Sequence, residues 1–197
     1  MKPQIRDKEF ESAAKRMISE KKHAVYMQHA LEDYHAYLRF MTGAFLEEPN
    51  EVRFIVRATY RLKKGLWREI EINGRQTLAD LASCIIESMD WVEDHLHGFW
   101  FPDERRNRIF GSYGMFHEEM EDDPHPTFKT KDVPISQVDW EKYPVLGFVF
   151  DFGDSHEFDI ALKQSCTEAS NTKRRPLPLL IDQRGVAPEQ YPEDDEE

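Results

Sequence analysis

The sequence lacks the features that mark membrane-spanning and secreted proteins. Its apolar runs extend over only a few residues, whereas a helix that crosses a bilayer needs about 20 consecutive apolar residues. Charged residues in the N-terminal segment MKPQIRDKEF stand where a signal peptide has its apolar region. Cysteine is scarce, and Cys84 and Cys166 lie far apart without paired spacing, which indicates free thiols rather than disulfides or a zinc site. We therefore expect a cytoplasmic protein that does not associate with membranes.

The sequence also lacks the motifs of several large enzyme classes. A Walker A loop, a dinucleotide-binding fingerprint, an H-E-x-x-H motif and a G-x-S-x-G motif are all absent. The triplet D-F-G at 151–153 matches the metal-binding segment of protein kinases. The Gly-rich loop, lysine strand and catalytic loop of a kinase are missing, however, so we interpret this triplet as a coincidence.

Apolar residues are plentiful, and the acidic charge is concentrated in two segments. Apolar residues make up 40% of the 197 positions, enough for one domain with an appendage or for two small domains. The net charge is −12, but removing the eleven acids of the two segments from the total of 38 leaves 27 acids against 26 bases. We interpret the segments as a solvated loop and tail, with contact between the tail and a basic partner as an alternative. The eleven acids are Glu118, Glu119, Glu121, Asp122, Asp123, Glu189, Glu193, Asp194, Asp195, Glu196 and Glu197.

Residues 7–47 form a predicted helical arm. Apolar side chains recur there at close to 3.6-residue spacing without an intervening proline, and the pattern ends before Pro49. The arm is either one long helix or a hairpin that bends near residues 21–23. It packs against the domain that follows or offers a surface to a partner. We expect three parts in the chain: a helical arm at 1–50, a folded domain at 51–188 and an acidic tail at 189–197.

Alternating and continuous apolar segments predict a domain of the α+β class. Its sheet is expected to be mixed or antiparallel, with helices packed against it. One helix should begin after Thr77, with Asp80 completing a capping box. After Cys166 the chain contains several prolines, and we expect irregular structure there. The predicted strands cover residues 52–62, 66–72, 95–101, 145–152 and 156–162.

Two of these strands carry histidine and aspartate residues that are candidates for a catalytic site. His95 and His97 lie two positions apart, so strand alternation places both side chains on one face, where they could approach one metal ion. Asp151, Asp154 and His156 surround the turn that follows another strand. If the two strands are neighbours, these groups converge into a metal-assisted hydrolytic site or an acid–base pair. The alternative is structural, with hydrogen-bonded histidines and Asp154 capping the turn, and it requires no cofactor.

Basic and aromatic residues on the first strand hairpin suggest a second kind of site. Arg53, Arg57 and Arg61 alternate along one strand, with Trp67 and Arg68 on the next. This combination resembles a phosphate-binding surface with a stacking platform for nucleic acid. Glutamates on the second strand supply counter-charges, so an internally paired surface, or one covered by the helical arm, is the alternative.

A series of short motifs follows in order over residues 52–192. They are Y-R-L-K with L-W-R at 60–68, T-L-x-D-L at 77–81, M-D-W at 89–91, H-L-H-x-F at 95–99, D-F-G-D at 151–154 and A-P-E at 187–189. The combination resembles the plasmid pRiA4b ORF-3-like family, also known as a transposon-passenger (TnpR-type) family. The resemblance implies a compact α+β domain and does not imply an established activity.

The chain departs from the family pattern after the D-F-G-D motif. Where the family usually has a Trp and a His, this chain has His156 and Phe158. If the family's pair forms a site, it is altered here, which favours binding over catalysis. We therefore predict a non-enzymatic protein-interaction module of mobile-element or plasmid context. It would act through the helical arm or the acidic tail, as an accessory or inhibitor of nucleic-acid machinery. The alternatives are a metal-assisted hydrolase or nuclease and a nucleic-acid-binding protein.

Overall fold

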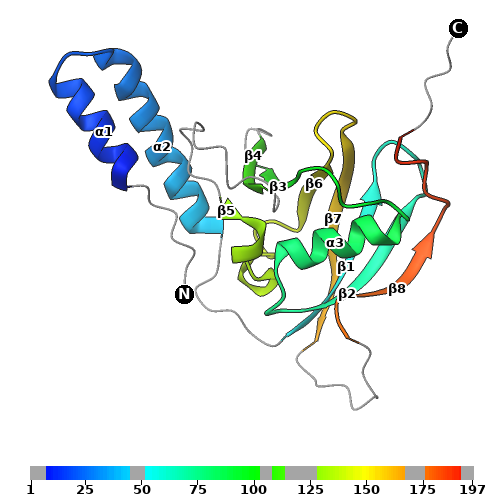
Figure 1. The fold of residues 1–197 in the computed structure, drawn as a ribbon. Coiled ribbons are helices and arrows are strands. Elements are labelled where there is room, and N and C mark those ends of the chain that lie inside the picture. The colour runs from blue at the N-terminus through cyan, green and yellow to red at the C-terminus, as the bar shows by residue number, and fades with distance from the viewer. Residues whose placement is uncertain (1–7, 45–51, 103–107, 114–127, 167–175, 192–197) are drawn as a thin grey trace, which may run out of the picture.

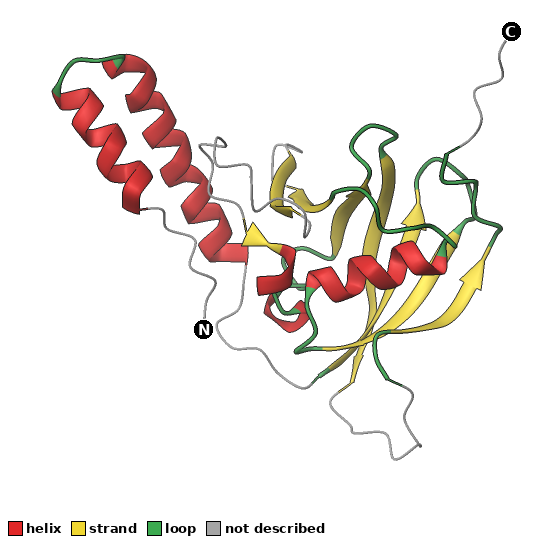
Figure 2. Cartoon of the chain, viewed as in Figure 1, coloured by secondary structure: helices red, strands yellow, loops and turns green. Residues whose placement is uncertain are grey.

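The computed structural model describes residues 8–44, 52–102, 108–113, 128–166 and 176–191. Two helices precede an eight-stranded sheet, and a third helix lies across one face of that sheet (Figure 1, Figure 2). No helix in these residues is both long and apolar enough to cross a membrane. The helices are α1 (Lys8–Ser19), α2 (Ala24–Ala44) and α3 (Leu78–Ser88). The strands are β1 (Arg53–Tyr60), β2 (Trp67–Asn73), β3 (His97–Pro102), β4 (Arg108–Tyr113), β5 (Phe128–Lys129), β6 (Val145–Phe150), β7 (His156–Cys166) and β8 (Leu179–Arg184).

The strands form one mixed sheet in the order β5-β4-β3-β6-β7-β1-β2-β8. Every neighbouring pair is antiparallel except β4 and β5, which run parallel. The β6–β7 hairpin occupies the middle of this order, so both of its strands are paired on both sides. The α+β class predicted from the sequence is confirmed, and the D-F-G-D motif forms the turn of the central hairpin.

Strand β8 corrects the expectation that the chain is irregular after Cys166. Its residues pair with β2 at the edge of the sheet, with a register shift opposite Glu69 and Ile70. The segment LLIDQR has no regular alternation and follows a proline-rich stretch, so its sequence alone resembles a loop. Pairing with a strand already in the sheet satisfies backbone groups that an isolated segment leaves to water. The predicted loop at 118–126 and residues 192–197 of the predicted tail lie outside the described residues.

The predicted helical arm is a hairpin of α1 and α2 rather than one long helix. At the bend, Lys21 and His23 have positive φ angles of 57° and 47°. The helices pack through Ala14 and Tyr34, both fully buried, and the ring of Phe10 meets that of Tyr34 edge-on at 5.0 Å. Figure 1 shows the hairpin projecting from one side of the sheet, with its bend at the far end. Its bend is therefore remote from the domain core.

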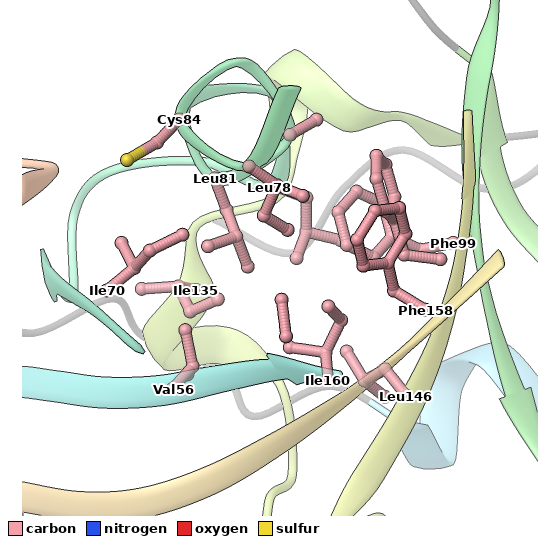
Figure 3. Close-up of a cluster of buried hydrophobic side chains, with 14 of the residues drawn as sticks. Val56, Ile70, Leu78, Leu81, Cys84, Phe99, Ile135, Leu146, Phe158 and Ile160 are labelled. Carbon is pink, nitrogen blue, oxygen red and sulfur yellow. The ribbon is translucent and has the colours of Figure 1, made fainter. Parts of the chain in front are cut away.

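The hydrophobic core lies between α3 and one face of the sheet. The helix begins as predicted, because Thr77 Oγ1 accepts the Asp80 N–H and the Asp80 carboxylate accepts the Thr77 N–H. Leu78 and Leu81 then point from the helix toward the sheet, where Ile160 of β7 lies among the core side chains (Figure 3). The capping box thus fixes the start of the helix, and its apolar face fixes how the helix lies on the sheet.

Candidate functional site

A polar cluster forms where the β6–β7 turn meets the segment that precedes β3. His95 lies in that segment, and its Nδ1 is 2.9 Å from Asp94 Oδ1. Its Nε2 is 3.6 Å from Oδ2 of Asp151, the first residue of the turn. The Tyr191 hydroxyl reaches the cluster from the C-terminal segment and donates to Asp94 Oδ1 at 2.7 Å. β3 and β6 are neighbours, as the predicted site required, and this arrangement brings His95 and Asp151 together.

The charges in this cluster shift one another's proton affinities. The hydrogen bond with Asp94, together with the charges of Asp151 and Asp154, raises the pKa of His95. In return, the hydrogen bonds from His95 and Tyr191 lower the pKa of Asp94. Burial and the hydrogen bond to Asp94 raise the pKa of Tyr191 to about 12, so its hydroxyl stays protonated. The cluster can therefore hold polar or charged groups, but Tyr191 is not activated as a nucleophile.

His97 does not join the cluster, although strand alternation predicted a face shared with His95. It is 1% exposed, and its Nε2 lies 3.1 Å from Thr130 Oγ1. Burial lowers the pKa of His97 to about 4, so the ring is neutral at physiological pH. The two imidazoles face different partners because β3 begins at His97, and strand pairing does not extend back to His95.

The turn between β6 and β7 is held by Asp151, not by Asp154 as the structural alternative proposed. The Asp151 Oδ1 accepts the Gly153 N–H at 2.8 Å, and Asp151 itself adopts a φ of 55°. Asp154 is exposed and contributes its charge to His95. Asp151 therefore combines a structural role in the turn with a charge beside His95.

His156 is packed into an aromatic environment at the start of β7. Its Nδ1 lies 3.0 Å from the Tyr60 hydroxyl, and its ring centroid is 4.3 Å from that of Trp91. The other ring nitrogen, Nε2, lies 3.2 Å from the backbone carbonyl of Gln190. Only 5% of the residue is exposed. These contacts assign His156 to the support of the C-terminal segment rather than to the His95 cluster.

The C-terminal segment at residues 184–191, which we call the strap, is held mainly through its backbone carbonyls. Side chains of the domain lie within hydrogen-bonding distance of five of these carbonyls, and Gln190 adds a pair of hydrogen bonds to the backbone N–H and C=O of Val92. The sequence interpretation did not assign the strap to the site, since its only signal was the A-P-E motif at 187–189. The pairs of side chain and carbonyl are Arg68 with Arg184 and Gly185, Lys63 with Val186, Trp91 with Pro188 and His156 with Gln190.

A groove with a volume of about 470 Å³ lies between the C-terminal end of α3 and the strap. Met89, Asp90 and Trp91 form one side of it, and residues 186–191 form the other. Volumes of this size suit a small ligand or a few side chains of a peptide. The groove and the His95 cluster share Tyr191, so the two features adjoin.

The predicted arginine row lies on the sheet face opposite α3, and carboxylates neutralise its charges. Arg57 donates to Glu69 through Nε and Nη2, and its guanidinium lies 4.2 Å from the ring centroid of Trp67. Arg68 is not part of this surface, because it is 3% exposed on the other face and donates to the Ser88 carbonyl. Nucleic-acid binding by the row stays a prediction. The remaining ion pairs of the row are Arg53 with Glu71 and Arg61 with Glu157 and Asp159.

The metal site predicted from His95 and His97 also stays a prediction. Within the described ranges, no three or more histidine, cysteine or acidic side chains are placed to hold a metal ion together. His97 faces Thr130, while His95 is engaged with Asp94.

The motifs M-D-W, H-L-H-x-F, D-F-G-D and A-P-E, which are far apart in sequence, meet around the cluster and the groove. A family model described as "Plasmid pRiA4b ORF-3-like protein" matches residues 57–194. The chain is also similar to the crystal structure of a protein of unknown function from Methanosarcina mazei Go1, with a TM-score of 0.56 and 19% identity. That similarity covers 73% of this chain and 74% of the other, and it concerns the fold alone. No curated protein matches the chain. The match over residues 57–194 shows that this chain belongs to the plasmid pRiA4b ORF-3-like family.

Proposed function

We propose that this chain is a non-enzymatic protein-interaction module that binds a partner protein through the bend of the α1–α2 hairpin. One observation supports the proposal above the others. Val25 and Tyr26, in the first turn of α2, are 72% and 69% exposed at the far end of a projecting hairpin (Figure 1). Two large, exposed apolar side chains at consecutive positions on such a projection suit contact with a hydrophobic surface of another protein.

The residues around the bend define the chemistry of the partner. Lys21, Lys22 and His23 precede the apolar pair in sequence, and all three are exposed, with the Lys22 ammonium 3.1 Å from the Glu20 carboxylate. The partner surface should therefore combine a hydrophobic pocket with flanking carboxylates. Since the family is associated with plasmids, machinery that acts on nucleic acids is the class of partner that we propose.

The other two candidate functions have less support. The arginines that were predicted to bind nucleic acid are already paired with glutamates and an aspartate across the sheet. A phosphate backbone would have to displace these carboxylates before it gained the same contacts. For the metal-assisted hydrolase, the His95 cluster supplies an imidazole beside carboxylates, but the described residues bring no three metal-ligating side chains together.

The test is a quantitative pull-down from cells of the source organism with full-length protein. The double variant Val25→Ser, Tyr26→Ser should weaken binding of a specific partner by about thirtyfold, because interface anchors contribute about 1 kcal/mol or more each. Leu62→Ser is the matched control, since Leu62 is 67% exposed on the domain. Equal capture by the double variant and the control would refute the role of the hairpin.

A further inference from the structure

The groove beside α3 combines an apolar lining with negative charge. Val186, Ala187 and Pro188 supply apolar surface, while Asp90 and Glu189 carry exposed carboxylates on opposite sides. The described residues that line the groove include no lysine, arginine or histidine. A long side chain with an apolar stem and a cationic head matches both properties.

The end of α3 adds to the negative potential of the groove. Met89 is the C-cap of this helix, so the helix directs its partially negative end toward the groove wall. Two basic side chains lie nearby, but their donors are committed to backbone carbonyls. Arg68 is buried against Ser88 and the start of the strap, and Lys63 donates to the Val186 carbonyl.

Further acidic residues extend the charge beyond the groove on the side of Tyr191. There lies the His95 cluster, where Asp94, Asp151 and Asp154 outnumber the single imidazole. A linear segment with several positive charges would therefore meet complementary charge along its length.

We propose that the groove between α3 and the strap binds a lysine- or arginine-rich segment of a partner protein. The stem of one basic side chain lies along Val186 and Pro188, and its charged head reaches the carboxylates of Asp90 and Glu189. Flanking basic residues contact the His95 cluster. This surface is separate from the hairpin bend, so the proposal does not depend on the function proposed for the hairpin.

The test uses full-length protein and a short fluorescein-labelled peptide in which lysine alternates with alanine. Fluorescence anisotropy should show binding that weakens as salt rises, while the counterpart peptide with glutamate in place of lysine should not bind. Asp90→Asn and Glu189→Gln should each weaken binding about two- to fivefold, the range for a partly exposed ion pair. Asn tolerates the positive φ of Asp90, which is 58°, so the fold should be preserved.

Two controls separate the groove from general attraction between opposite charges. Glu141→Gln removes an exposed acid outside the groove and should leave binding unchanged. The peptide should also shift the indole N–H resonance of Trp91, which lies in the groove wall and donates to the Pro188 carbonyl. The proposal is overturned if Asp90→Asn and Glu189→Gln bind the peptide as the parent does. It is equally overturned if neutralising the five terminal acids abolishes binding while the Trp91 resonance never moves.

Discussion

Arg68 connects three parts of the fold: the C-terminal end of α3, strand β8 and the strap. It is 3% exposed, and burial lowers the pKa of its guanidinium although the charge of Asp90 opposes this shift. Its Nε donates to the Ser88 carbonyl at 2.9 Å. Its Nη1 lies 3.0 Å from the Trp67 carbonyl and 3.2 and 3.3 Å from the carbonyls of Arg184 and Gly185. Replacement by methionine keeps most of the packing volume but removes every one of these donors.

The expected loss follows from these contacts. A hydrogen bond from a charged donor contributes about 1.5–3 kcal/mol, and the three Nη1 contacts, which share one donor nitrogen, count together as one such bond. Two bonds therefore amount to about 3–6 kcal/mol. Part of this is offset, because the variant no longer buries a charged guanidinium. We expect Arg68→Met to lower the free energy of unfolding by about 3–4 kcal/mol.

Urea denaturation followed by circular dichroism measures this change. The m value shows whether the variant exposes the same surface on unfolding as the parent protein. Arg184→Met is the matched control, because Arg184 is exposed on β8 and should change stability by less than about 0.5 kcal/mol. Arg68→Lys should lie between the two, since lysine keeps the charge but cannot reach several carbonyls at once. A loss below about 1 kcal/mol for Arg68→Met, with an unchanged m value, would refute the reasoning.

Three further predictions concern other parts of the domain. Thr77→Ala should destabilise the protein by about 1 kcal/mol through loss of the α3 cap, whereas Thr77→Ser should be nearly neutral in the same urea titration. Gly147→Ala should lower the free energy of unfolding by about 2–3 kcal/mol, because a Cβ there would lie 1.8 Å from Cε2 of the buried Trp100 ring. An unchanged melting temperature in calorimetry would contradict this expected clash. The folded pKa of His95 lies above its unfolded value of 6.5, so its ion pair stabilises the fold fully below pH 6.5 and is lost as pH rises through the folded pKa. An NMR titration of the His95 ring should show a midpoint above 6.5 that falls in Asp94→Asn, and an unshifted midpoint in that variant would exclude the pairing.

Local patterns were sufficient to predict the elements whose signals lie within a few residues. Thr77 and Asp80 predicted the start of α3 because a capping box is complete within four positions. Alternation predicted β1 because its burial follows the strand period, and the continuous apolar run predicted β6 because this central strand is buried on both faces. The bend of the helical arm stayed open, since two helices and one long helix have the same periodicity.

Tertiary structure decided everything that depends on partners distant in sequence. The strap belongs to the site because side chains such as Lys63 and Trp91, about 100 residues away in sequence, donate hydrogen bonds to its backbone carbonyls. Every residue has a backbone carbonyl, so a sequence does not indicate which carbonyls will be bonded in this way. Strand β8 forms because its backbone can pair with the edge of β2. Likewise, Arg57 and Arg68 lie on opposite faces of the sheet, so Arg57 pairs with Glu69 while Arg68 is buried. Only the fold determines which residues pack against each face.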